Sequence, residues 1–139
     1  MPKQEEQSLL RDKNKSAYKL AGFPEVLWIN LDRFPDRKKY MEEQFSYWEI
    51  PDHHRISGVD GVQYEEYLKG TVPDNMNSGE CACVMSHLNA LKYFVEETDL
   101  DEIIIMEDDV DLDTARHWNF TWKEIRKRLP INFDCLQLT

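Results

Sequence analysis

Short apolar runs alternate with segments of helical periodicity along the chain. Residues 26–31 and 103–106 are apolar runs rich in β-formers, which is typical of buried strands. Residues 54–57 indicate a shorter strand between them. Pro35 marks a helix start, because proline is preorganised for a first helical turn, and Pro51 closes that segment. We expect the runs at 26–31 and 103–106 to be neighbours or near neighbours in one parallel sheet.

The second half of the chain repeats this alternation. Asn77 and Glu80 stand three residues apart, as in a capping box, at the start of a predicted helix. Further on, residues 118–129 predict a helix that ends at Pro130, and residues 133–138 predict a fourth strand. The helix after Asn77 carries one apolar face, made of Val84, Leu88, Leu91 and Val95. Strands alternating with helices predict α/β layers around a mainly parallel sheet.

The domain organisation follows from the same pattern. Residues 1–22 are polar and charged and predict a flexible arm, whereas residues 23–139 predict one α/β domain. The fourth predicted strand lies at the end of the sequence, so we expect the sheet to be incomplete. No apolar run reaches the roughly 20 residues that span a bilayer. No secretory signal is visible, so we expect a cytoplasmic location.

Composition and charge narrow the classes of partner. The chain has 139 residues, of which 41% are hydrophobic, and this suits a folded domain. A formal net charge of −10 argues against binding nucleic acid or an anionic membrane. A small phosphate-bearing substrate remains compatible with this charge if a divalent cation lies between carboxylates and phosphate.

The cysteines predict no metal site. Cys81, Cys83 and Cys135 are odd in number, and we interpret them as buried free thiols in a reducing compartment. A metal site would call for a Cys-x-x-Cys pair or histidines at ligand spacing, and this pattern shows neither.

An acidic segment carries the candidate chemistry. Glu107, Asp108 and Asp109 directly follow the strand predicted at 103–106, where open α/β sheets bind ligands. Adjacent ionised carboxylates repel one another. A positive group such as a hard divalent cation offsets this repulsion and keeps them ionised. A solvated acidic turn is the alternative. Residues 109–113 also loosely match an aspartate-nucleophile phosphohydrolase motif, which we keep as a rival interpretation.

Four stretches, taken in order, point to a known family: residues 29–33 with Asp36 and Arg37, residues 57–61, residues 79–87 and residues 104–109. With these stretches the chain resembles glycosyltransferase family 25, which includes bacterial lipooligosaccharide galactosyltransferases and collagen galactosyltransferases. The resemblance implies a GT-A-type, Rossmann-like sheet flanked by helices. It also implies transfer of a hexose, galactose or glucose, from a UDP-sugar to a hydroxyl of a glycan or protein acceptor.

The resemblance further implies a divalent cation, Mn²⁺ or Mg²⁺, held by Glu107 and Asp109. The candidate donor-binding residues are Asn30, Arg33, Arg37, Asp60, Ser86, His87 and Asp108. A guanidinium suits phosphate and an aspartate in a turn suits ribose or base hydroxyls, but solvated charges and an Asx-turn are the alternatives. His87 has a satisfied buried histidine as its alternative.

One residue departs from the family pattern, since Ala82 stands where the family usually has glycine. No catalytic base can be named from the sequence. A non-catalytic nucleotide- or metal-binding module, or a scaffold, therefore stays an alternative to an enzyme, and a homodimer stays open.

Overall fold

The computed structural model describes residues 16–68, 70 and 74–138, and its contacts divide the chain into two compact units. One unit comprises residues 24–45 and 51–110. The other comprises residues 46–50, the residues from 111 onwards and the segment that precedes residue 24. Residues 1–15 of the predicted arm lie outside the described part.

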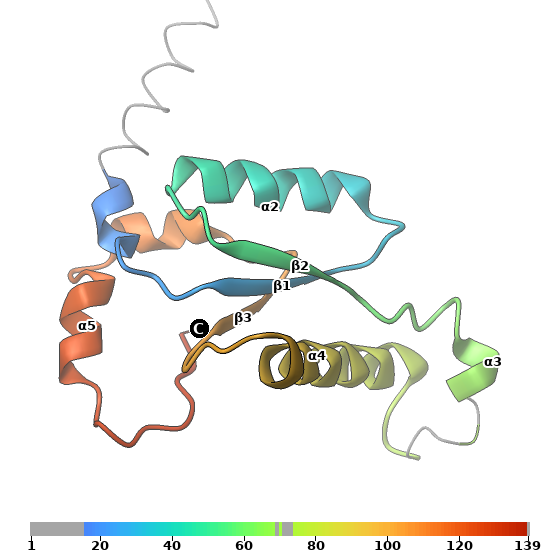
Figure 1. The fold of residues 1–139 in the computed structure, drawn as a ribbon. Coiled ribbons are helices and arrows are strands. Elements are labelled where there is room, and N and C mark those ends of the chain that lie inside the picture. Colours follow the sequence, from blue (N-terminus) through green and yellow to red (C-terminus); the bar gives the residue numbers. More distant parts are fainter. Residues whose placement is uncertain (1–15, 69, 71–73, 139) are drawn as a thin grey trace, which may run out of the picture. The chain divides into compact units, whose positions relative to one another are not determined.

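The first unit is built on a three-stranded parallel sheet (Figure 1). Its strands are β1 (Val26–Asn30), β2 (His53–Ser57) and β3 (Ile104–Glu107), in the order β2-β1-β3. Val26 lies opposite both His53 and Ile104. All five residues of the central β1 are buried, as an apolar run between two neighbours requires. The three predicted strands and the parallel pairing of the first with the third are confirmed.

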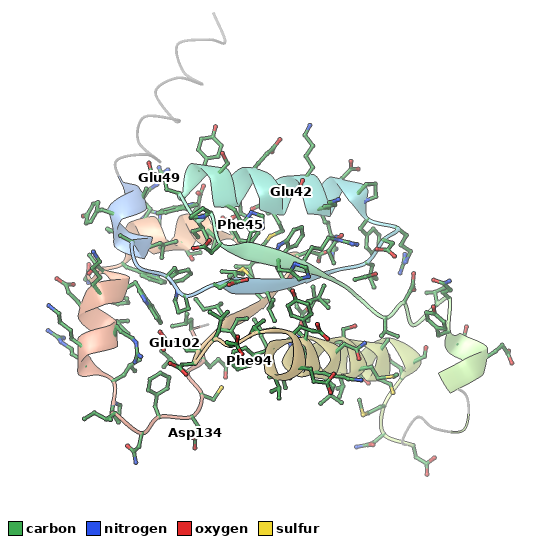
Figure 2. All side chains as sticks on the ribbon, viewed as in Figure 1. Glu42, Phe45, Glu49, Phe94, Glu102 and Asp134 are labelled. Atoms are coloured by element: carbon green, nitrogen blue, oxygen red, sulfur yellow. The ribbon has the colours of Figure 1, made fainter. Side chains whose placement is uncertain are left out.

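Helices cover both faces of this sheet. Figure 1 shows α2 (Pro35–Tyr47) on one face and α4 (Ser78–Glu97) on the other. Trp28 packs against Phe45 of α2, with ring centroids 5.7 Å apart. Leu27 and Ile29 of β1 form a core with Ala90 of α4. Phe94 of α4, labelled in Figure 2, packs against this core. The α/β class and the parallel, helix-flanked sheet of a GT-A-like fold are therefore confirmed.

The α4 helix begins where the sequence predicts, but it packs through a different face. Asn77 and Glu80 form the reciprocal capping box. The predicted apolar face is exposed, at 49%, 58%, 46% and 75% for Val84, Leu88, Leu91 and Val95. The buried positions are Ala82, Ser86 and Ala90. Small side chains let the helix approach the strands closely, and periodicity alone does not tell which face is covered.

The connection between β2 and α4 contains the short helix α3 (Glu65–Leu68). In the second unit, η1 (Ala17–Leu20) contacts both η2 (Leu112–His117) and α5 (Trp122–Arg128). Lys19 donates to the carbonyl oxygens of Arg116 and Trp118 at 2.6 and 2.7 Å. The helix predicted at 118–129 begins only at Trp122, because Thr121 and Glu124 form a capping box there.

The predicted fourth strand is wrong. Residues 133–138 are described and are not in a strand. Leu136 and Leu138 are exposed, and neither strand ladder includes this segment. Alternating apolar residues favour an extended chain, but a strand also needs a neighbour to pair its backbone groups.

Candidate functional site

The three strands end at one edge of the sheet, beside a pocket of about 240 Å³. Figure 1 shows α2 on one face of the sheet and α4 on the other, and in open α/β sheets ligands bind beyond the carboxyl ends of the strands. Six of the predicted site residues line the pocket: Arg33, Arg37, Ser86, His87, Glu107 and Asp108. Ser78 and Gly79, in the first turn of α4, also line it.

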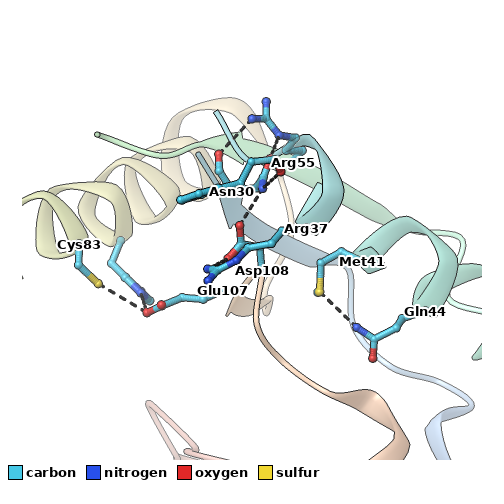
Figure 3. A network of polar contacts seen from close by, with 10 residues as sticks. Asn30, Arg37, Met41, Gln44, Arg55, Cys83, Glu107 and Asp108 are labelled. Carbon is cyan, nitrogen blue, oxygen red and sulfur yellow. Dashed lines mark hydrogen bonds and ion pairs between the residues drawn. The ribbon is translucent and has the colours of Figure 1, made fainter. Parts of the chain in front are cut away.

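Asp108 is buried and is held by two other predicted residues (Figure 3). Asn30 Nδ2 donates to Asp108 Oδ2 at 2.7 Å, and Arg37 Nη1 donates to Asp108 Oδ1 at 3.2 Å. Both carboxylate oxygens of Asp108 are thus occupied from β1 and α2. This arrangement suits a residue that orders the site more than one that takes a ligand.

Asn30 is buried and links the end of β1 to β2 and to the turn after β3. Its Nδ2 also donates to the carbonyl oxygen of Phe34, and its Oδ1 accepts from Arg55 Nε at 2.9 Å. Arg55 of β2 further donates to Asp32, and the hydrogen bonds from Arg55 and Ser57 hold the pKa of that carboxyl below its usual value. Nothing in the sequence pattern singles out Arg55 and Asp32 as a pair, since a mid-strand arginine gives no signal of its partner.

Asp60 lies outside the pocket lining and positions Arg33 instead. Arg33 Nε donates to Asp60 Oδ2 at 2.7 Å, and the Val62 amide donates to Asp60 Oδ1 at 3.0 Å. Burial raises the pKa of Asp60, but these hydrogen bonds outweigh it and the pKa lies below its usual value. Asp60 therefore forms the Asx-turn that was its alternative. At the same time it orients the Arg33 guanidinium at the pocket.

Ser86 also has a structural contact. Its hydroxyl accepts from the Val59 amide at 2.8 Å and donates to the Ala82 carbonyl at 2.8 Å. This contact ties the turn after β2 to α4. A Cβ on Gly61 would lie 2.9 Å from the Ser78 carbonyl oxygen, so only glycine permits this close approach.

Glu107 meets two side chains of α4 in the pocket. Its Oε1 lies 3.0 Å from His87 Nε2 and accepts from Cys83 Sγ at 3.5 Å (Figure 3). His87 and Glu107 are half-exposed, so the buried histidine that was the alternative is not what the structure has. Burial raises the pKa of the Cys83 thiol, and the charges of Glu107 and Asp109 raise it further.

These three ligand atoms lie within 4.8 Å of one another and could hold a metal ion. Asp109 is exposed and lies close enough to Cys83 to act on it electrostatically. The interpretation of the cysteines as buried thiols is wrong, because Cys83 and Cys135 are exposed and Cys81 is partly so. The missed signal was the spacing of Cys83 and His87, four residues apart on a predicted helix and hence on one face.

The sequence model of glycosyltransferase family 25 (LPS biosynthesis protein) matches residues 23–133, which cover the sheet and every residue of the pocket. The chain belongs to glycosyltransferase family 25. Searches of curated proteins and of solved structures gave no match.

Family 25 membership supports glycosyltransferase activity in general, with a sugar donor and an acceptor. Within the described ranges no helix is long and apolar enough to cross a membrane. Ala82, the departure from the family pattern, is buried and lines the pocket. Its methyl group therefore occupies the wall of the site.

Proposed function

We propose that the protein binds a UDP-hexose with a divalent cation in the strand-end pocket and transfers the hexose to a hydroxyl acceptor. The observation that carries this proposal is the convergence of two arginines and an accessible carboxylate on one pocket: Arg33, Arg37 and Glu107. Opposite charges at one site suit a ligand that has both phosphate oxygens and a bound metal ion.

The arginines supply the phosphate side of the site. Asp60 engages only the Nε of Arg33, and Asp108 engages one terminal nitrogen of Arg37. Each guanidinium has five N–H donors, so both retain donors for phosphate oxygens while their partners fix their direction. Both side chains are about half-exposed and can therefore reach a ligand from the pocket wall.

Glu107 and Asp109 supply the metal side. Carboxylate oxygens are the ligands that Mn²⁺ and Mg²⁺ prefer, and both residues are exposed, Glu107 at the end of β3 and Asp109 in the turn that follows. Asp108, between them, has both oxygens in protein contacts and is the less suitable ligand. A bound cation would neutralise charge on the departing diphosphate.

The pocket volume sets how much of the donor is enclosed. At about 240 Å³ it lies just below the range of about 300–1,000 Å³ for small-molecule sites. A pocket of this size encloses only part of a UDP-hexose, so the remainder of the donor extends beyond it. The acceptor hydroxyl must then approach from the open side.

A transfer assay tests the proposal. The purified protein is incubated with UDP-galactose or UDP-glucose, Mn²⁺ and a panel of sugar, lipid-linked sugar and hydroxylysine acceptors, and released UDP is measured. Acceptor-dependent release of UDP that stops when EDTA is added would support the proposal. Hydrolysis of a generic phosphate ester without any sugar transfer would instead support the phosphohydrolase alternative, which family 25 membership disfavours.

A further inference from the structure

We propose that Cys83, His87 and Glu107 form a Zn²⁺ site, distinct in its chemistry from the oxygen-only pair Glu107 and Asp109. The three ligand atoms are Sγ, Nε2 and Oε1, all within 4.8 Å of one another. This proposal rests on the positions of the three side chains in the protein alone and does not depend on the proposed donor.

The two separations that involve Glu107 match those of ligands around one zinc ion. Bonds of about 2.3 Å to sulfur and about 2.0–2.1 Å to nitrogen or oxygen place tetrahedral S and O ligands about 3.5 Å apart, and N and O ligands about 3.3 Å apart. Cys83 Sγ lies 3.5 Å from Glu107 Oε1, and His87 Nε2 lies 3.0 Å from it. Both separations from Glu107 thus lie within a few tenths of an ångström of the zinc values, and Cys83 Sγ and His87 Nε2 lie within 4.8 Å of each other.

The backbone fixes these positions. Cys83 and His87 are one turn apart on the 20-residue α4, with the buried Ser86 between them bonded to the Val59 amide. Glu107 is the last residue of β3, which pairs with the central strand. Two ligands on a helix and one on a strand end need little ordering when the ion binds.

The choice of ligands selects the metal. Thiolate and imidazole favour zinc, whereas Mn²⁺ and Mg²⁺ prefer oxygen ligands throughout. Zinc binding would displace the thiol proton to solvent and leave the imidazole neutral. Three protein ligands leave a fourth position for water or another oxygen, and the half-exposed His87 and Glu107 give access from the pocket.

Cobalt spectroscopy on the whole chain tests this site, because Co²⁺ replaces Zn²⁺ and reports a bound thiolate by charge-transfer absorption. We expect one Co²⁺ per chain with this absorption, displaced by an equivalent of Zn²⁺. Cys83→Ser should abolish the absorption, and His87→Ala should weaken Zn²⁺ binding at least tenfold. Circular dichroism establishes that each variant is folded.

Two further variants serve as controls. Cys135→Ser removes another exposed thiol and should leave the absorption and the Zn²⁺ affinity unchanged. Asp109→Asn should keep the absorption even if it loses Mn²⁺-dependent nucleotide binding. This variant therefore distinguishes failure of the zinc site from failure of the proposed donor site. Absence of charge-transfer absorption in the wild type, or its persistence in Cys83→Ser, would overturn the zinc site.

Discussion

Asn30 Nδ2 donates a 2.7 Å hydrogen bond to Asp108 Oδ2 across 78 residues of sequence, and both residues are buried. This bond joins the end of the central strand to the turn that follows β3. Gln44 of α2 holds the same segment further along, donating to the Val110 carbonyl at 2.9 Å. The acidic turn is thus fixed by the sheet and one helix before any ligand binds.

Replacing Asn30 should cost stability. Asn30→Leu leaves Asp108 Oδ2, Arg55 Nε and the Phe34 carbonyl without this partner. Each buried polar group left unpaired costs about 1–3 kcal/mol, so we expect a loss of at least about 1 kcal/mol in the free energy of unfolding. Urea denaturation measures it, with the exposed Lys39→Ala expected within about 0.5 kcal/mol of the wild type. Equal midpoints for the two variants would contradict the role of this junction.

Arg33 should matter for nucleotide binding. Arg33→Ala removes a guanidinium that Asp60 holds at the pocket, and we expect UDP affinity to fall at least tenfold, about 1.4 kcal/mol. Lys39→Ala makes the same change of charge on a side chain that does not line the pocket. Calorimetric titration with UDP compares them. A similar loss of UDP affinity in both variants would show that the change in net charge alone causes the effect.

The two sides of α4 should differ in how strongly a change of side-chain volume affects stability. Ala90 is fully buried against the sheet, so Ala90→Leu should cost about 1–3 kcal/mol through overpacking. Leu88 is 58% exposed, and Leu88→Ala should stay within about 0.5 kcal/mol of the wild type. Thermal or urea unfolding measures both. A large loss in Leu88→Ala would show that this face is covered in solution.

His53 should make stability depend on pH. Its Nδ1 accepts from Trp28 Nε1 at 3.3 Å, its ring stacks on Phe45, and burial lowers its pKa below 6.5. The unfolded chain then binds a proton before the folded one does, so this contribution is complete above about pH 6.5 and is lost as pH falls further.

Unfolding free energies from pH 5 to pH 7.5 test this dependence. The decrease towards pH 5 should be smaller in His53→Phe than in the wild type, because phenylalanine keeps the ring contact and cannot be protonated. An equally steep decrease in the variant would assign the pH dependence to other groups.

Zinc should compete with the donor cation if both proposed sites exist, because they share Glu107. We expect micromolar-range Zn²⁺ to suppress Mn²⁺-dependent UDP binding in the wild type and to suppress it at least tenfold less effectively in Cys83→Ser. The measurement is UDP titration at fixed Mn²⁺ with increasing Zn²⁺. Equal suppression in both proteins would contradict competition through the thiol.

The sequence predicts well what local chemistry decides. The three strands, the helix start at Pro35 and the capping box at Asn77 follow from residue type and spacing. Placing Glu107 at a strand end also predicts that it faces a ligand crevice. These features depend on neighbours in the chain, which the sequence displays directly.

What the sequence does not show depends on distant partners. Asp108 and Asp109 are adjacent, yet only Asp108 is buried against Asn30, because the turn after β3 directs the two side chains differently. The covered face of α4 was missed because small residues such as Ala90 carry a weak hydrophobic signal. The strand predicted at 133–138 was wrong because it has no neighbouring strand.

Calorimetric titration of the wild type and Asp109→Asn with UDP, with and without Mn²⁺, tests the central proposal most directly. The proposal predicts that Mn²⁺ strengthens UDP binding to the wild type and that Asp109→Asn weakens Mn²⁺-dependent binding at least tenfold, about 1.4 kcal/mol. A folded wild type that binds UDP no better with Mn²⁺, or a variant that binds as tightly as the wild type, would contradict it.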